Sequence, residues 1–73
     1  DLNERQLKAI DFLRQNKSIK SKIYANMNNI SLPIALRDIA ELIKFGYLKK
    51  VGSFRGAYYI LKETKDKKVE MGV

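Results

Sequence analysis

One stretch, Ser31 to Gly46 (SLPIALRDIAELIKFG), constrains the fold most, because it carries both the start and the end of a single helix. Ser31 is a favourable N-cap, since its hydroxyl can accept a hydrogen bond from an unpaired N–H group in the first turn. Pro33 suits that first turn, where its missing N–H group costs little. Gly46 can adopt the left-handed conformation that ends helices, and Lys44 complements the negative end of the helix dipole.

This predicted helix has two different sides at about 100° per residue. We predict that its apolar side is buried, and that side comprises Leu32, Ala35, Ile39, Leu42 and Ile43. The opposite side carries Pro33, Arg37, Ala40 and Lys44. The rest of the chain decides whether this second side reads nucleic acid.

A first helix is predicted from about residue 4 to Gln15. Asn3 is its expected N-cap, and Gln6 stands three residues later, as in a capping box. Its inner face is predicted to contain Leu7, Ile10 and Leu13, which repeat at three-residue steps. We expect the helix to end at Asn16 in a left-handed cap.

A short second helix is predicted over residues 21–27, starting at Lys20 or Ser21. We expect Ile19, just before it, to pair with a later hairpin as a stub of strand. The inward face of this helix is predicted to carry Ile23, Tyr24 and Met27. Asn29 follows in a turn and tolerates a positive φ angle. Two helices joined by about four residues indicate a helix-turn-helix unit.

Two β-prone runs, 47–51 and 57–61, flank a loop bounded by Gly52 and Gly56 and predict a hairpin. Which of Tyr58 and Tyr59 faces inward is left open. Phe54 at the tip either folds back onto Tyr58, which we favour slightly, or contacts a base or another surface. The predicted fold is therefore α+β: a small winged helix-turn-helix over residues 1–61, with three helices and a two- to three-stranded β-wing. Residues 62–73 are expected to be a charged, disordered tail.

The composition excludes several classes of function. The 73 residues suit one small domain, and we expect it to be part of a longer protein because the sequence starts at Asp1 without Met. The chain has no cysteine and no histidine, which removes the commonest metal ligands and general base. We therefore expect no enzyme activity, metal or cofactor. No apolar run approaches the roughly 20 residues of a membrane span and no signal peptide is visible, so we expect a cytoplasmic protein without membrane contact.

The net charge of +7 is concentrated in one part of the chain. Residues 1–15 sum to zero, whereas residues 16–61 hold eight basic and two acidic side chains. The remaining residues, 62–73, contribute +1. A localised basic excess favours a polyanionic partner, with double-stranded DNA first, although lysine-rich surfaces can also serve solubility alone.

The segments LNERQLKAIDFL, IKSKIYANMNNIS and ALRDIAELIKFGYLKKVGSFRGAYYIL resemble a particular winged-helix segment. It occurs at the C-terminus of many Fic-family proteins, RecG-like proteins and related transcriptional regulators. The resemblance covers nearly all of residues 2–61 and implies a DNA-binding module attached to another part. In that family, polar or basic residues usually follow the capping serine, whereas Leu32, Pro33 and Ile34 stand here. None of these three can hydrogen-bond a base edge, so we expect weak base readout.

The predicted DNA contacts come from the start of the second helix, the long helix and the hairpin. They are Lys20, Ser21, Lys22, Ser31, Pro33, Ile34, Arg37, Lys44, Lys49, Lys50, Ser53 and Arg55. Arg37 either contacts DNA or pairs with Glu41 four residues later. Asp38 would repel phosphate, so we expect it to bind a basic residue of the first helix or the wing. Arg55 at the hairpin tip suits a minor groove.

Two alternatives to an independent DNA-binding module remain. The apolar edge formed by Leu32, Pro33, Ile34 and Leu36 is suited to a homodimer or to a protein partner. The domain could also be the regulatory part of an enzyme such as a Fic protein or a helicase.

Overall fold

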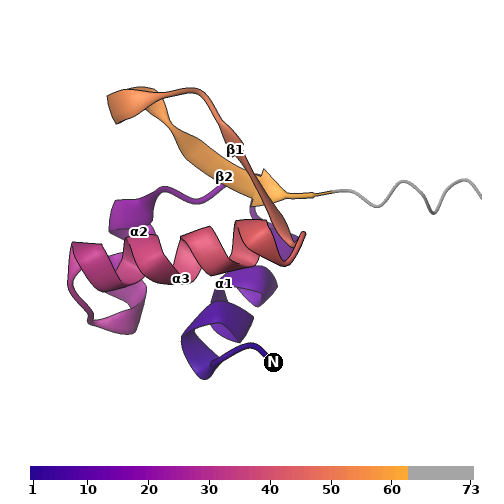
Figure 1. The fold of residues 1–73 in the computed structure, drawn as a ribbon, viewed down its shortest axis with the longest axis vertical. Coiled ribbons are helices and arrows are strands. Elements are labelled where there is room, and N and C mark those ends of the chain that lie inside the picture. Colours follow the sequence, from indigo (N-terminus) through magenta and orange to yellow (C-terminus); the bar gives the residue numbers. More distant parts are fainter. Residues whose placement is uncertain (63–73) are drawn as a thin grey trace, which may run out of the picture.

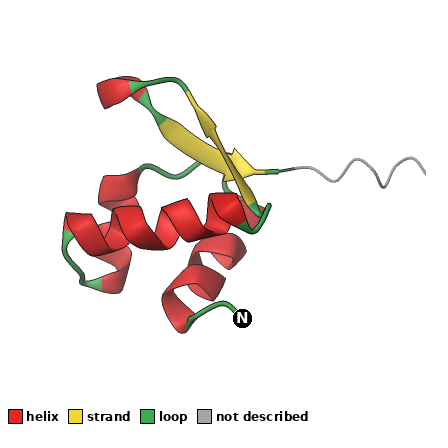
Figure 2. Ribbon diagram, in the orientation of Figure 1, coloured by secondary structure: helices red, strands yellow, loops and turns green. Residues whose placement is uncertain are grey.

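The computed structural model describes residues 1–62, which form three helices followed by an antiparallel hairpin (Figures 1 and 2). The helices are α1 (Glu4–Gln15), α2 (Ser21–Asn28) and α3 (Leu32–Lys44). Strands β1 (Leu48–Val51) and β2 (Tyr58–Leu61) enclose a short 3-10 helix, η1 (Phe54–Gly56). The predicted winged helix-turn-helix layout is confirmed. Apart from Lys62, the predicted tail lies outside the described residues.

The helix ends form largely where local residue types predict them. Asn3 and Gln6 make the predicted capping box, in which each side chain accepts from the other residue's backbone N–H, at 2.8 and 2.9 Å. Ser31 Oγ accepts from the Ile34 N–H at 3.5 Å, and Asn29 has a φ of +54°. The left-handed cap predicted at Asn16 is wrong. Its backbone is extended, and its N–H and side chain both donate to the Phe12 carbonyl.

The hairpin is tied to the helices by a third short strand segment. The Ile19 and Tyr59 backbones exchange two N–H···O bonds of 2.9 Å, which confirms the predicted pairing of Ile19 with the hairpin. At the base of the hairpin, the Lys62 N–H donates to the Tyr47 carbonyl at 2.9 Å and extends the pairing of β1 with β2 by one residue pair. The base of the wing is therefore fixed between the start of α2 and the end of α3.

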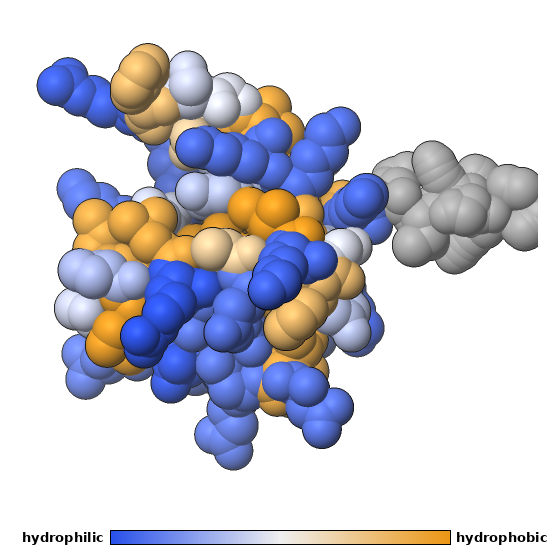
Figure 3. All heavy atoms as spheres, viewed as in Figure 1, coloured by the Kyte–Doolittle hydropathy of each residue, from blue (hydrophilic) through white to orange (hydrophobic). Residues whose placement is uncertain are grey.

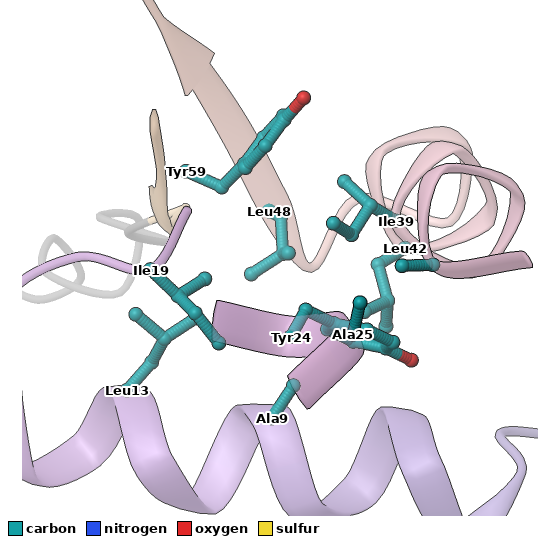
Figure 4. Close-up of a cluster of buried hydrophobic side chains, with 10 residues drawn as sticks. Ala9, Leu13, Ile19, Tyr24, Ala25, Ile39, Leu42, Leu48 and Tyr59 are labelled. Carbon is teal, nitrogen blue, oxygen red and sulfur yellow. The ribbon is translucent and has the colours of Figure 1, made fainter. Parts of the chain in front are cut away.

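The three helices and both strands contribute to one buried core (Figure 4). Tyr59 is the hairpin tyrosine that faces inward. Leu48 lies on the same face of the sheet, because it is two residues before Lys50, the residue of β1 that pairs with Tyr59. The buried apolar side chains are Ala9, Leu13, Ile19, Tyr24, Ala25, Ala35, Ile39, Leu42, Leu48 and Tyr59. Ile10, Met27 and Ile30 are half-buried against them.

The predicted inner face of α1 is partly wrong, because Leu7 is 54% exposed. Three-residue steps drift by about 60° each, so Leu7 lies about 120° around the helix from Leu13. The buried face instead runs through Gln6, Ala9 and Leu13, which a period of 3.6 residues aligns. A buried glutamine is tolerated there because its amide is fully hydrogen-bonded to α3 and to the cap.

The predicted inner faces of α2 and α3 are also partly wrong. In α2 the buried pair is Tyr24 and Ala25, and Ile23 lies on the exposed side. Viewed down the axis of α3, the buried residues span an arc with Ile39 at one end and Asp38 at the other. Ile43 lies about 90° around the helix from the centre of this arc. Ile43 and Leu32 are therefore exposed, at 37% and 43%. Because Asp38 is buried, α3 is rotated about its axis relative to the orientation that apolar residues alone predict.

Candidate nucleic-acid interface

Asp38 of α3 anchors this helix to α1 and α2. Its carboxylate accepts from Arg5 Nε at 2.6 Å and from Arg5 Nη2 at 3.1 Å. The Tyr24 hydroxyl donates to the same carboxylate at 2.8 Å, and Asn3 Nδ2 adds a longer contact of 3.4 Å. The prediction that Asp38 binds a basic residue of the first helix is confirmed.

The electrostatics of this cluster keep Asp38 ionised and Tyr24 neutral. Burial alone would raise the pKa of Asp38, but the hydrogen bonds from Arg5 and Tyr24 and the Arg5 charge lower that pKa. Burial, then the hydrogen bond to Asp38 and its negative charge, raises the pKa of the Tyr24 hydroxyl well above its usual range. The hydrogen bond to Asp38 likewise raises the pKa of Arg5.

The second carboxylate of α3 is also held from the α1 side. Glu41 accepts a hydrogen bond of 3.0 Å from the buried Gln6 side chain, which also donates to the Asp38 carbonyl at 3.1 Å. The predicted alternative of an Arg37–Glu41 ion pair is not formed. Among residues 1–62, Arg37 has no carboxylate within 4.0 Å, and the salt bridge present is Arg5–Asp38.

The opposite side of α3 is exposed along its whole length, and we call it the outer face. It combines apolar residues with two bases and includes no acidic residue. Figure 3 shows hydrophobic and hydrophilic side chains next to each other over α3 on the face in view. Arg37 and Lys44 are seven residues apart, about 10 Å along the axis. The outer face consists of Leu32, Pro33, Leu36, Arg37, Ala40, Ile43 and Lys44.

The hairpin separates two lysines that the sequence prediction grouped together. Lys50 pairs with Tyr59 and Lys49 with Ile60, so the two lysines point to opposite faces of the sheet. Because Tyr59 faces the helices, Lys50 is on the side turned toward them and Lys49 is on the outer side. The two lysines therefore cannot both contact one surface that approaches a single face of the hairpin.

The start of α2 carries three more predicted contact residues. Lys20 is the N-cap without a side-chain cap hydrogen bond, Lys22 is exposed, and Ser21 is half-buried. Lys20 follows directly after Ile19, which is bonded to β2. The structure therefore brings this basic helix start next to the base of the wing.

The remaining predicted contacts divide between the start of α3 and the hairpin tip. Ser31 is exposed, but its hydroxyl caps α3, and Ile34 is half-buried. Ser53 and Arg55 are exposed at the tip, at the far end of the hairpin from the helices (Figure 1). The favoured fold-back of Phe54 is wrong, since this residue is 92% exposed. Phe54 was absent from the predicted contact set, although its position between two glycines was the available signal.

Within the part of the chain that the structure describes, no cluster of three or more acidic side chains is placed to hold a metal ion. None of the helices in residues 1–62 has the length and apolar character needed to cross a membrane. Comparison with protein-family models and with curated proteins gives no match for this chain.

Proposed function

We propose that this domain is a winged-helix module that binds double-stranded DNA, mainly through the phosphate backbone and with weak base readout. It would act in the cytoplasm within a larger regulator or nucleic-acid-processing protein, as the resemblance to the Fic-family and RecG-like segment implies. In this proposal the outer face of α3 contacts the DNA, Lys20 and Lys22 lie beside a phosphate, and the hairpin lies against a neighbouring groove.

The observation that carries this proposal is the separation of charge across α3. Its two carboxylates, Asp38 and Glu41, are hydrogen-bonded from α1, whereas Arg37 and Lys44 are exposed on the outer face. Residues 47–62, which form the hairpin and its flanks, contain four basic side chains and no acidic one. A phosphate backbone approaching α3 and the wing therefore meets bases without a facing, unengaged carboxylate.

Salt dependence of binding tests this proposal directly. We expect fluorescence anisotropy with a labelled duplex of about 20 base pairs to show binding at low salt. Four phosphate contacts would give a logarithmic salt slope of about −3.6 and a loss of roughly 150-fold in affinity between 50 and 200 mM salt. The double variant Arg37→Gln, Lys44→Gln should reduce that slope by about 2 units.

The matched control replaces two exposed bases of α1, Lys8 and Arg14, with glutamine. This variant has the same net charge as the α3 variant but should retain the wild-type slope. Equal slopes for the two double variants would show that charge alone, without a defined face, causes the binding. An absence of duplex binding by the wild type at low ionic strength would refute the proposal.

A second candidate function is homodimer formation through the apolar part of the outer face. The observation that favours it is the exposure of Leu32 and Leu36 at 43% and 44%, next to exposed Pro33. Ile34, predicted as part of this edge, is half-buried and contributes less. Sedimentation velocity would then show a concentration-dependent dimer that Leu36→Asp abolishes and Arg37→Gln preserves. A monomer at all concentrations would exclude this candidate.

A further inference from the structure

Phe54 occupies the hairpin tip in a conformation that bulky side chains rarely adopt. Its φ is +52°, in the left-handed region that favours glycine, and its side chain is 92% exposed. The strain and the exposed apolar surface are both unfavourable for an isolated domain. Because this side chain buries almost nothing within residues 1–62, neither cost is offset there, which points to a contact with a partner.

The tip is a defined turn that projects this side chain. The Gly56 N–H donates to the Ser53 carbonyl and the Ala57 N–H donates to the Phe54 carbonyl, both at 3.2 Å. A Cβ atom at Gly52 would lie 3.3 Å from the Gly56 carbonyl oxygen, so the two arms of the turn approach closely there. The phenyl ring is therefore held at the end of a narrow, hydrogen-bonded support.

The surroundings of Phe54 select an anionic partner. Arg55 is adjacent and exposed, Lys49 and Lys50 precede it on β1, and no acidic residue lies between 47 and 62. A single aromatic ring on a narrow basic projection has too little apolar area to bind a flat protein surface. It does have the size and flat shape needed to enter a step between two bases, where both of its faces would be covered.

We propose that Phe54 inserts between bases of the bound DNA, and that the domain consequently prefers duplexes with a weakened base step, such as a mismatch or a single-base bulge. This inference rests on the proposed DNA binding. Opening a normal base step has a substantial free-energy cost, and this cost is lower at a mismatch or bulge, where the bases are already less well stacked. The ratio of the affinities for a weakened and an intact duplex, and not the overall affinity, therefore reports the insertion.

The experiment measures the dissociation constants of the full chain for two labelled duplexes that differ only in one single-base bulge. We expect the wild type to bind the bulged duplex roughly tenfold more tightly, and Phe54→Ala to bind both about equally. The matched control is Phe45→Ala, which removes another exposed phenylalanine, at the end of α3, and should retain the tenfold preference. A 2-aminopurine base beside the bulge should brighten on binding of the wild type and not of Phe54→Ala.

Each outcome separates this inference from the proposed function. If the wild type binds both duplexes equally, or if Phe54→Ala keeps the preference, insertion is refuted while DNA binding stands. If the wild type binds neither duplex at low salt, the proposed function itself fails and the insertion fails with it. The inference would also be overturned if Phe54→Ala lost binding to phosphatidylserine vesicles but kept the wild-type preference between the two duplexes. That result would assign the ring to a lipid surface.

Discussion

The two sides of α3 use similar residue types for opposite purposes. Its inner side buries Leu42 and Ile39 and holds the Asp38 carboxylate with three donors from α1 and α2. Its outer face leaves Leu36 exposed and Arg37 without a carboxylate partner in residues 1–62. Charged and apolar side chains thus stabilise the fold on the inner side, whereas side chains of the same kinds are available for binding on the outer face. Substitutions on the two sides should separate stability from binding.

The largest effect should come from removing apolar volume on the inner side. Leu42 is fully buried, so Leu42→Ala should lower the free energy of unfolding by about 3 kcal/mol through lost burial and a residual cavity. Leu36→Ala removes the same atoms from the same helix, but Leu36 is 44% exposed and the loss should stay below about 1 kcal/mol. Urea unfolding followed by circular dichroism measures both, and equal losses would contradict the assignment of the two sides.

A slightly smaller loss is expected when the acceptor of the buried cluster is removed. Asp38→Ala leaves the Tyr24 hydroxyl and the Arg5 guanidinium without their carboxylate, which should cost about 2 to 3 kcal/mol. Glu41→Ala is the matched control, because Glu41 is exposed and accepts one hydrogen bond, and should cost less than about 1 kcal/mol. A comparable loss for both variants in urea unfolding would show that burial of Asp38 is not what anchors α3.

The pH dependence of stability should report the same cluster with a smaller effect. The folded-state pKa of Asp38 is lowered, so its carboxylate stabilises the fold above its unfolded pKa of about 3.9, and this contribution is lost as the pH falls through the folded pKa. The difference in unfolding free energy between the wild type and Asp38→Asn should therefore be constant from about pH 5 to about pH 8 and shrink below about pH 4. A difference that grows on acidification would contradict the direction of the shift.

Local residue types predicted much of the fold, because the signals they carry act over a few residues. The Asn3–Gln6 capping box, the Ser31 cap and the positive φ of Asn29 each depend on groups close in the chain. The order of helices and strands follows from these boundaries. Pairing of Ile19 with the hairpin was also predicted, from its place in a short connector between two helices.

The rotation of α3 could not be predicted from apolar periodicity, because it depends on partners distant in the sequence. Arg5 and Asp38 are 33 residues apart, and their pairing buries an aspartate at the expense of Ile43 and Leu32. The burial of Gln6 has the same origin, since its amide binds α3. Polar side chains whose hydrogen bonds are met across the core can displace apolar ones from it.

The candidate site was predictable in its residue types and less so in its geometry. Exposed lysines and arginines follow from the high cost of burying their charge. Lys49 and Lys50, as neighbours in one strand, must point to opposite faces. Which of them faces the helices, however, depends on the strand register, which the sequence left open together with the direction of Tyr58 and Tyr59. The projection of Phe54 was the less favoured of two alternatives, and its positive φ was not predicted, because a phenylalanine in that conformation contradicts its own local preference.

The smallest effect in this series concerns that strained residue, and it has the opposite sign. Asparagine tolerates the left-handed conformation better than phenylalanine, and Phe54 buries almost nothing, so Phe54→Asn should raise the free energy of unfolding by about 0.5 kcal/mol. Ser53→Asn at the neighbouring extended position, where φ is −146°, should leave stability unchanged. Thermal unfolding resolves this difference, since 1 kcal/mol corresponds to about 4 to 8 °C in a domain of this size. A loss of stability in Phe54→Asn would show that the ring makes a stabilising contact in the free protein, and the tip would then belong with the inner side of α3 among the parts that maintain the fold.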